Sequence, residues 1–509
     1  MKTYPYPMPA EVDAIYHAGN SAHPNPLRDA LPPPLDRDAV LENLKKLPPY
    51  SDDERALQPD EKFCRLDRIL EVFYPLTYYI NLQRAVDRAM RNSYEHRNPL
   101  NPGFYRNVVN ASQSISQFSV PAGMSKADCP GFAIAGDSGI GKSSATKRTL
   151  ELTPRLINHS SFNGTRFPFR QVPWIKVDCP PDGSTRALCV KVLEAYDSVL
   201  STEYVSLYDR KGVNANKLMS HIERVACFHG TGVAVIDEIQ NLAFAPSGGA
   251  DQVLAFFSVL MHCFGLPVIL IGTIDAVRLL SSRFSQARRA TGYCNPIWTR
   301  ILKDEPDWNI LLRALWRYQY TAVRTTLTPE IDDAMYDSTQ GIADNVAKLY
   351  RAIQEKLIYR QKEKQEITPK VIRETAATFF GLQKDHLRYI SGAADLVPLE
   401  PDRRDGNNIG RDYQLPNELA MVKKAHLQFD SVYNPRTIPP AETLSTAASS
   451  LTKDGGYTQL NPPKKTVKSK AKRAPHPVFE AHKASETSGQ PISNLLVETG
   501  FAVKTSELL

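Results

Sequence analysis

The residues best suited to chemistry lie in one glycine-rich stretch. In order they are Gly136, Asp137, Ser138, Gly139, Ile140, Gly141, Lys142 and Ser143. Their spacing fits G-x-x-x-x-G-K-[ST], a loop whose backbone N–H groups cradle phosphate oxygens, with the lysine on the outer phosphates and the serine hydroxyl on Mg²⁺. Ser144 continues into a predicted helix, whose dipole adds positive potential at the loop. We therefore expect ATP and Mg²⁺ as cofactors; the alternative is a glycine turn that matches the pattern by chance.

A pair of carboxylates follows a second apolar run; the first, residues 132–135, leads into the glycine loop. Residues 233–236 read Val-Ala-Val-Ile, and Asp237 and Glu238 come directly after them. Such a run suits a buried strand. Asp237 would hold Mg²⁺ through water, and Glu238 would orient or deprotonate the attacking water. A polar strand end without chemistry is the alternative, but the glycine loop upstream favours the chemical interpretation.

A third apolar run, residues 268–271, leads to Gly272 and Thr273. Ligands of a doubly wound sheet lie beyond the carboxyl ends of its strands. Thr273 is therefore placed to sense the γ-phosphate or to hold the lytic water. Helical spacing between and after these runs completes the pattern. It predicts the α/β class, with a P-loop doubly wound parallel sheet and an α-helical lid, flanked by N- and C-terminal extensions.

Length and composition predict a soluble globular protein of about three domains. The chain has 509 residues, of which 42% are hydrophobic and 23% charged, and its formal net charge is +7. No apolar run reaches the roughly 18–20 residues that span a bilayer, and no signal-peptide core opens the chain, so we expect a cytoplasmic location. The seven cysteines are odd in number and never spaced C-x-x-C, which favours free thiols over disulfides or zinc. The positive charge allows a nucleic-acid partner without requiring one.

Four segments, in this order, resemble the TnsC/TniB-type AAA+ regulators of DNA transposition, and the TnsC branch is the better match. They are the glycine loop, residues 236–242 (IDEIQNL), residues 270–273 (LIGT) and residues 286–293 (QARRATGY). The resemblance covers roughly residues 90–390. The glycine loop by itself specifies only an NTPase, so the D-E-I-Q-N-L and A-R-R segments carry the narrower likeness.

The resemblance implies an ATPase whose slow hydrolysis acts as an assembly switch. Protomers would assemble as a ring or helical filament around duplex DNA, contacting its backbone independently of sequence, and hydrolysis would disassemble them. The assembly would connect a target-selecting DNA-binding protein, expected at the N-terminal end, to the transposase, expected at the C-terminal end.

The resemblance also implies roles for residues outside the three apolar runs. AAA+ proteins form the adenine pocket ahead of the first strand, where this chain has Tyr94 and Arg97. Ring-forming members complete each site with an arginine from the neighbouring protomer, which stabilises charge on the transferring phosphoryl group. Arg288 or Arg289 would be that finger, with Arg283 as the second choice. Ordinary surface placement is the alternative for each.

One departure from the related initiators concerns the lid. After Gln340 and Gly341, where those proteins place a sensing arginine, residues 342–345 read Ile-Ala-Asp-Asn. If this alignment holds, the lid reports nucleotide less directly, and turnover is slow.

Arg186 is the first candidate for DNA contact. Ser184 is suited to cap a helix, which places Arg186 in the first helical turn, where a cation opposes the dipole. Contact with phosphate would explain that misfit, and the related regulators use a lysine of the corresponding segment against the DNA backbone. Arg210 and Lys211 form a second candidate pair. Such contacts would be independent of sequence and sensitive to salt, while a solvated surface is the alternative.

The domain boundaries follow from shifts in composition. We expect an N-terminal extension (residues 1–110), an AAA+ nucleotide-binding domain (111–320), a helical lid (321–395) and a largely disordered basic tail (396–509). Prolines in residues 1–60 should prevent long helices, so we expect this part to order only on a partner. Residues 63–96 show helical spacing and should either pack on the ATPase as a helical cap or form a plain helical core. Residues 464–473 carry six basic residues in ten and could lie on DNA or on an acidic partner, while a merely solubilising tail is the alternative.

Two other functions remain open on the sequence. A replication-initiator or helicase-loader ATPase would share the same core, but usually carries a DNA-reading winged-helix domain. A signalling or secretion NTPase would have no DNA role, and its basic residues would only be surface.

Overall fold

The computed structural model describes residues 8–17, 24–95, 97–101, 104, 129–245, 248–276, 293, 297–360 and 365–391. All of them belong to the first of two compact units, Met1–Lys423. The basic run at 464–473, with the rest of the predicted tail, lies outside the described residues. Among the helices that are described, none is long and apolar enough to cross a bilayer.

Five parallel strands form the central sheet, and three of them are the predicted apolar runs before the glycine loop, before Asp237 and before Thr273. In sheet order they are β5 (Trp174–Asp178), β6 (Val233–Asp237), β7 (Val268–Gly272), β2 (Phe132–Gly136) and β8 (Ile297–Trp298). β7 pairs with β6 on one side and with β2 on the other, both in parallel register. The carboxyl ends of these strands therefore meet at one edge of the sheet.

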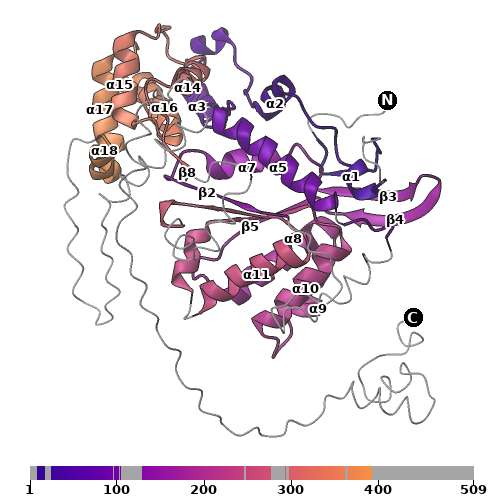
Figure 1. The fold of residues 1–509 in the computed structure, drawn as a ribbon. Helices are drawn as coiled ribbons and strands as arrows, with labels where there is room; N and C mark the ends of the chain where they lie inside the picture. Colours follow the sequence, from indigo (N-terminus) through magenta and orange to yellow (C-terminus); the bar gives the residue numbers. More distant parts are fainter. Residues whose placement is uncertain are drawn as a thin grey trace, which may run out of the picture. The chain divides into compact units, whose positions relative to one another are not determined.

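Helices cover both faces of this sheet, which confirms the predicted α/β class (Figure 1). On one face lie α5 (Thr77–Glu95) and α7 (Lys142–Leu150); on the other lie α8 (Thr185–Leu200), α10 (Ala215–Phe228) and α11 (Gly249–Cys263). Alternate residues of β6 serve the two layers, since Val233 and Val235 join the core with α5, while Ala234 and Ile236 join the core with α8. Because both faces are buried, the strands read as continuous apolar runs.

A hairpin that the sequence analysis missed adds a second, three-stranded sheet. Its strands are β1 (Glu11–Asp13), β3 (Leu156–Phe162) and β4 (Thr165–Gln171), with β3 in the middle. The turn residues Asn163 and Gly164 have φ angles of 48° and 78°. A type I′ hairpin turn requires positive φ at both central residues, and Asn-Gly between strand-forming residues is its usual signal.

Residues 24–71 fold against the core of the chain itself. They form α1 (Pro26–Asp29), α2 (Arg37–Leu44), the 3₁₀ helix η1 (Asp52–Ala56), α3 (Pro59–Leu66) and α4 (Arg68–Glu71). The prediction that prolines keep these helices short is confirmed, since the longest have eight residues. The prediction that the segment orders only on a partner is wrong for residues 24–60, because Leu27, Val40 and Leu44 are fully buried within the chain.

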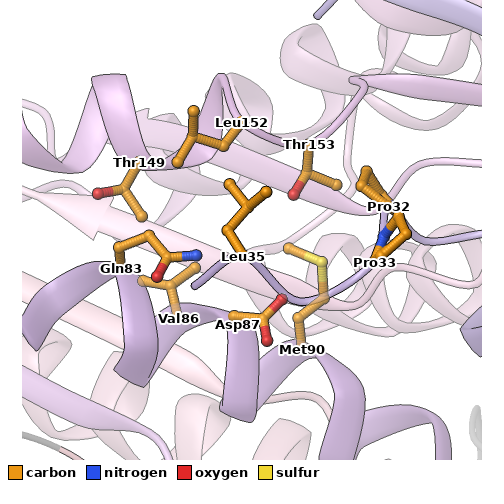
Figure 2. A pocket seen from close by; sticks show the side chains of 10 residues that line it. All are labelled: Pro32, Pro33, Leu35, Gln83, Val86, Asp87, Met90, Thr149, Leu152 and Thr153. Carbon is orange, nitrogen blue, oxygen red and sulfur yellow. The ribbon is translucent and has the colours of Figure 1, made fainter. Parts of the chain in front are cut away.

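A small pocket marks the junction between this segment and the helices on the sheet. Figure 2 shows its lining, which comes from three places. Pro32, Pro33 and Leu35 belong to the segment, Val86 and Met90 to α5, and Thr149, Leu152 and Thr153 to the last turn of α7 and the residues just after it. The N-terminal segment therefore contacts the same helix that begins at the predicted phosphate-binding lysine.

The short helix α9 (Tyr204–Tyr208) packs on α8. The 3₁₀ helix η2 (Ile239–Phe244) follows β6. After β8 come α14 (Pro306–Trp316), α15 (Pro329–Thr339), α16 (Ala343–Tyr359), α17 (Pro369–Phe379), the 3₁₀ helix η3 (Gly381–Gln383) and α18 (Lys384–Ile390). The predicted cap at Ser184 is confirmed, since its side chain accepts from the Ala187 N–H, and Thr368 caps α17 in the same way by accepting from the Val371 N–H. Helices α15 to α18 lie within residues 321–395, where the sequence predicts a helical lid.

Glu223 is a buried acid outside these predicted features. It lies on α10, and neither of its carboxylate oxygens has a hydrogen-bond partner among the described residues. Burial raises the pKa of Glu223 to about 9, against about 4.3 in an unfolded chain. The folded state therefore binds this proton more tightly than the unfolded chain does. As a result, the contribution of Glu223 to the free energy of unfolding is greatest below the unfolded pKa and is lost as the pH rises toward the folded pKa.

We therefore expect Glu223→Gln to be more stable than the parent at about pH 8, and to lose less stability between about pH 5 and 9. Urea denaturation across this range measures the effect. Glu194→Gln, which changes an exposed acid of α8, should keep the parent's pH dependence. Equal losses of stability in the parent and in Glu223→Gln would contradict a buried, protonated acid.

Candidate nucleotide site

The glycine loop has the backbone geometry that its sequence predicts. Gly139 and Gly141 have φ angles of 82° and 92°, in the left-handed region that favours glycine. A Cβ on Gly136 would lie 2.2 Å from the Trp298 carbonyl oxygen on β8. The loop ends where α7 begins at Lys142, and the first N–H groups of a helix have no acceptor within it. Helix start and glycine turn together form an anion-binding site.

The side chain of Lys142 folds back onto this loop. Its ammonium Nζ donates to the carbonyl oxygens of Gly136 at 2.8 Å and Asp137 at 2.7 Å. The side chain is buried, and this desolvation lowers the pKa of Lys142 from its ordinary value. Ser143 and Ser144, in the first turn of α7, are exposed. Their hydroxyls are therefore open to a ligand at the loop.

Asp237 and Glu238 occupy the carboxyl end of β6 and differ in their surroundings. Asp237 is 2% exposed, and its Oδ1 accepts the Glu238 N–H at 2.9 Å. Glu238 is exposed, and its backbone is left-handed, with φ 55° and ψ 38°. For a residue with a side chain this conformation is strained, and such strain is concentrated at functional sites.

Lys176 is a member of this cluster that the sequence analysis missed. Its Nζ lies 2.8 Å from Asp237 Oδ2 and 3.0 Å from Asp178 Oδ1. Although burial lowers it, the pKa of Lys176 is raised overall by the two carboxylates. Parallel pairing sets Asp178 of β5 opposite Asp237 of β6 and so brings Lys176 to the acidic pair. The only sequence signal was a lysine within an otherwise apolar strand, W-I-K-V-D.

Thr273 follows β7 at the same edge. Its hydroxyl Oγ1 is buried and has no hydrogen-bond partner among the described residues, and its N–H donates to Gln240 Oε1 at 3.1 Å. The structure thus brings the phosphate loop, the acidic pair and Thr273 to the ends of three adjacent strands. Their roles toward nucleotide stay predictions.

The oxygen donors at this edge suit Mg²⁺ only in part. A serine hydroxyl and a buried carboxylate are the hard ligands that Mg²⁺ prefers. Within the described part of the chain, no group of three or more His, Cys, Asp or Glu side chains could hold a metal ion. A Mg²⁺ ion at Ser143 and Asp237 would therefore need phosphate oxygens and water as further ligands.

The lid contacts the phosphate loop directly. The Asp344 N–H, at the start of α16, donates to the Gly139 carbonyl oxygen at 3.0 Å. A Cβ on Gly139 would lie 3.0 Å from Ile342 and 3.2 Å from Asp344. The segment without the expected arginine is thus the one that meets the loop, and there Asp344 pairs with Lys348.

Tyr94 and Arg97, predicted for the adenine pocket, lie in the core. The Tyr94 hydroxyl donates to the Gly230 carbonyl oxygen at 2.7 Å, and burial raises its pKa to about 12. Arg97 donates to the Ser93 carbonyl oxygen at 2.9 Å. The residue of α5 that reaches the loop is Tyr79, whose hydroxyl donates to the Ile140 carbonyl oxygen at 3.0 Å. A contact of Tyr94 or Arg97 with the base stays a prediction.

The candidate arginines divide into two groups. Arg283, Arg288 and Arg289 lie outside the described residues. Arg186, in contrast, forms an ion pair with Asp209 and donates to the Val213 carbonyl oxygen. It thereby lies against the turn that carries Arg210 and Lys211. The structure brings both predicted DNA-contacting groups to one surface.

The comparison with protein families finds an AAA domain in part of the chain. A family described as an AAA domain matches residues 127–280, a range that includes the glycine loop, the acidic pair and Thr273. No curated protein matches the chain. Neither the family match nor the search of curated proteins supports the predicted resemblance to the regulators of DNA transposition.

Several solved structures are similar to parts of this chain. A Walker-type ATPase of Pyrococcus abyssi is 14% identical, with a TM-score of 0.33 over 56% of this chain and 75% of that one. Cdc6p from Pyrobaculum aerophilum is 14% identical, with a TM-score of 0.33 over 54% and 66%. The ORC2 protein of Aeropyrum pernix, in ADPNP-ADP complexes, is 11% identical, with a TM-score of 0.34 over 65% and 82%.

The pairing of Lys176 with Asp237 generates a testable prediction. Lys176→Met leaves a buried carboxylate without its lysine, and since Lys176 is 20% exposed, the loss should be about 1–3 kcal/mol, below that of a fully buried pair. Because Mg²⁺ with ATP would restore positive charge there, it should raise the melting temperature of Lys176→Met more than that of the parent.

Lys191→Met is the control, because among the described residues the Lys191 ammonium donates to the Asp178 carbonyl oxygen and forms no ion pair. It should change stability little and leave the response to Mg²⁺ unaltered. If Lys176→Met unfolds like the parent with and without Mg²⁺ and ATP, Lys176 does not balance the charge of Asp237.

Proposed function

We propose that this chain is an ATPase whose nucleotide state controls its assembly on duplex DNA. The observation that carries the proposal is the convergence of the phosphate loop, Asp237, Glu238 and Thr273 at one sheet edge, with the start of α16 against Gly139. The AAA domain match over residues 127–280 supports the ATPase part.

The chain's own groups would divide the work at this edge. The N–H groups of the glycine loop and Lys142 would bind the phosphates, while Ser143 and Asp237 would hold Mg²⁺. Bound Mg²⁺ supplies positive charge to the phosphate oxygens. Glu238, whose carboxylate is exposed, would accept a proton from the attacking water, and Thr273 would orient that water or the γ-phosphate. Arg288 or Arg289 of a neighbouring protomer would complete the site.

Contact with DNA is proposed for the surface formed by Arg186, Arg210 and Lys211. The ion pair with Asp209 holds Arg186 at the turn that also carries the exposed residues Arg210 and Lys211. Such a group suits the phosphate backbone and reads no base edges. Protomers would then assemble as a ring or filament around the duplex.

The finer proposal is a regulator of DNA transposition. It rests on the resemblance of residues 236–242, 270–273 and 286–293 to the TnsC/TniB-type regulators. In this role the N-terminal part would receive a target-selecting protein, and residues 396–509 would engage the transposase.

A replication-initiator or helicase-loader ATPase is the second candidate, because the same site and the same lid support it equally well. Among the described residues no strand follows β8, so a winged-helix domain is not found in that part of the chain. Co-purification with a transposase or with a replicative helicase separates the two. A signalling or secretion NTPase would bind neither, and would not retain DNA.

Coupling of nucleotide to DNA is tested at the phosphate loop. Lys142→Ala removes a charge-assisted contact, so nucleotide affinity should fall about tenfold or more. ATP-dependent retention of duplex DNA in a filter-binding assay should fall with it. Lys147→Ala, on an exposed position of the same helix, should leave both unchanged. Normal DNA retention by Lys142→Ala in the presence of ATP would refute the coupling.

The DNA surface is tested by its salt dependence. Arg186→Ala should weaken DNA binding and reduce the slope of log affinity against log salt by about 1, since one phosphate contact is lost. Binding of a fluorescent ATP analogue should stay as in the parent. Arg166→Ala removes the same charge from an exposed position on β4 and should keep the parent's slope; equal slopes for all three proteins would place the DNA elsewhere.

A further inference from the structure

We propose that Gln240 is a positioning residue that aims the carboxylate of Glu238 by tying it to the end of β7. This inference rests on the proposed ATPase and deepens it. The side-chain amide of Gln240 makes two contacts at once: its Nε2 donates to Glu238 Oε2, and its Oε1 accepts the Thr273 N–H at 3.1 Å. One side chain thus joins the ends of β6 and β7.

Only an amide of this length satisfies both contacts. Glu238 presents an acceptor, and the Thr273 N–H is a donor, so the bridging group must donate at one end and accept at the other. A carboxylate at position 240 could accept from Thr273 but would face Glu238 with a like charge. A leucine would make neither contact.

The surrounding backbone is shaped to hold Gln240 in place. A Cβ on Gly272 would lie 2.8 Å from Gln240 Oε1, so the absence of a side chain there leaves room for the amide. Glu238 has the left-handed backbone described above, and η2 begins at the next residue. This turn directs both side chains toward the space beyond β7.

The consequence for chemistry is a restrained base. Glu238 is exposed, and a glutamate side chain without partners samples several rotamers. The bond from Gln240 occupies Oε2, while Oε1 has no hydrogen bond to a described residue and stays available to a water molecule. Because the other end of the amide holds the Thr273 N–H, the carboxylate is fixed relative to the residue proposed to meet the γ-phosphate.

Three variants of the full chain test this role. Gln240→Leu removes both contacts, and Gln240→Glu keeps the acceptor for Thr273 but loses the donor to Glu238. Asn241→Leu is the matched control, because the Asn241 amide also anchors η2 but donates to the Cys179 carbonyl oxygen at 3.0 Å.

In steady-state ATP hydrolysis, both Gln240 variants should lower kcat about 10- to 100-fold, the effect expected of a misplaced catalytic group. Their KM and their affinity for a fluorescent ATP analogue should stay within about twofold, since nucleotide is bound elsewhere, and Asn241→Leu should keep kcat within about threefold. A kcat for Gln240→Leu equal to or above that of the parent, or an equal loss in Asn241→Leu, would overturn the proposal.

Hydrogen exchange provides a readout that does not depend on turnover. In the protein without nucleotide, Gln240→Leu should accelerate exchange of the Thr273 amide, seen in the peptide that contains β7, whereas Gln240→Glu and Asn241→Leu should keep it protected. Unchanged protection in Gln240→Leu would remove the contact on which the inference stands. If the parent hydrolyses no ATP, the proposed function fails, while the exchange result still decides whether Gln240 holds the end of β7.

Discussion

The parallel register of β6, β7 and β2 is the constraint on which the rest of the structure depends. Gly136, Asp237 and Thr273 are far apart in sequence, and they meet only because the three strands end at the same edge. A slip of one residue in β6 would turn its side chains to the opposite face and move Asp237 away from the loop. The register is held by burial on both sides, since alternate residues of β6 pack into two different helical layers.

Charge balance is the second requirement of this edge. Asp237 is 2% exposed, and a buried carboxylate is costly unless it is paired and hydrogen-bonded. Lys176 and the Glu238 N–H meet that need, one at each carboxylate oxygen. Lys142 is satisfied differently, by two carbonyl oxygens of its own loop. The outer strand β5 is thereby part of the site and not only of the sheet.

The phosphate loop is held from two sides by elements that precede and follow the sheet in sequence. Tyr79 of α5 bonds to Ile140, and Asp344 at the start of α16 bonds to Gly139. A shift of either helix would therefore be felt at the loop. The N-terminal segment shares this layer, because it packs against α5 and the end of α7 (Figure 2). It supports the nucleotide site through packing, in addition to any role toward a partner.

The sequence by itself determined the features that depend on neighbouring residues. These features are the glycine turn, the apolar runs before Asp237 and Thr273, and the cap at Ser184. Each is a local pattern whose physics needs no distant partner. Tertiary structure alone decided which other side chains join the site. Strand order brings Lys176 of β5 to the acidic pair, and the turn after β6 brings Gln240 there. Helix docking brings Tyr79 of α5 and Asp344 of the lid to the loop. Tyr94 shows what a local pattern cannot encode. The resemblance places it in the adenine pocket, but α5 packs against the core and brings the Tyr94 hydroxyl to the Gly230 carbonyl oxygen.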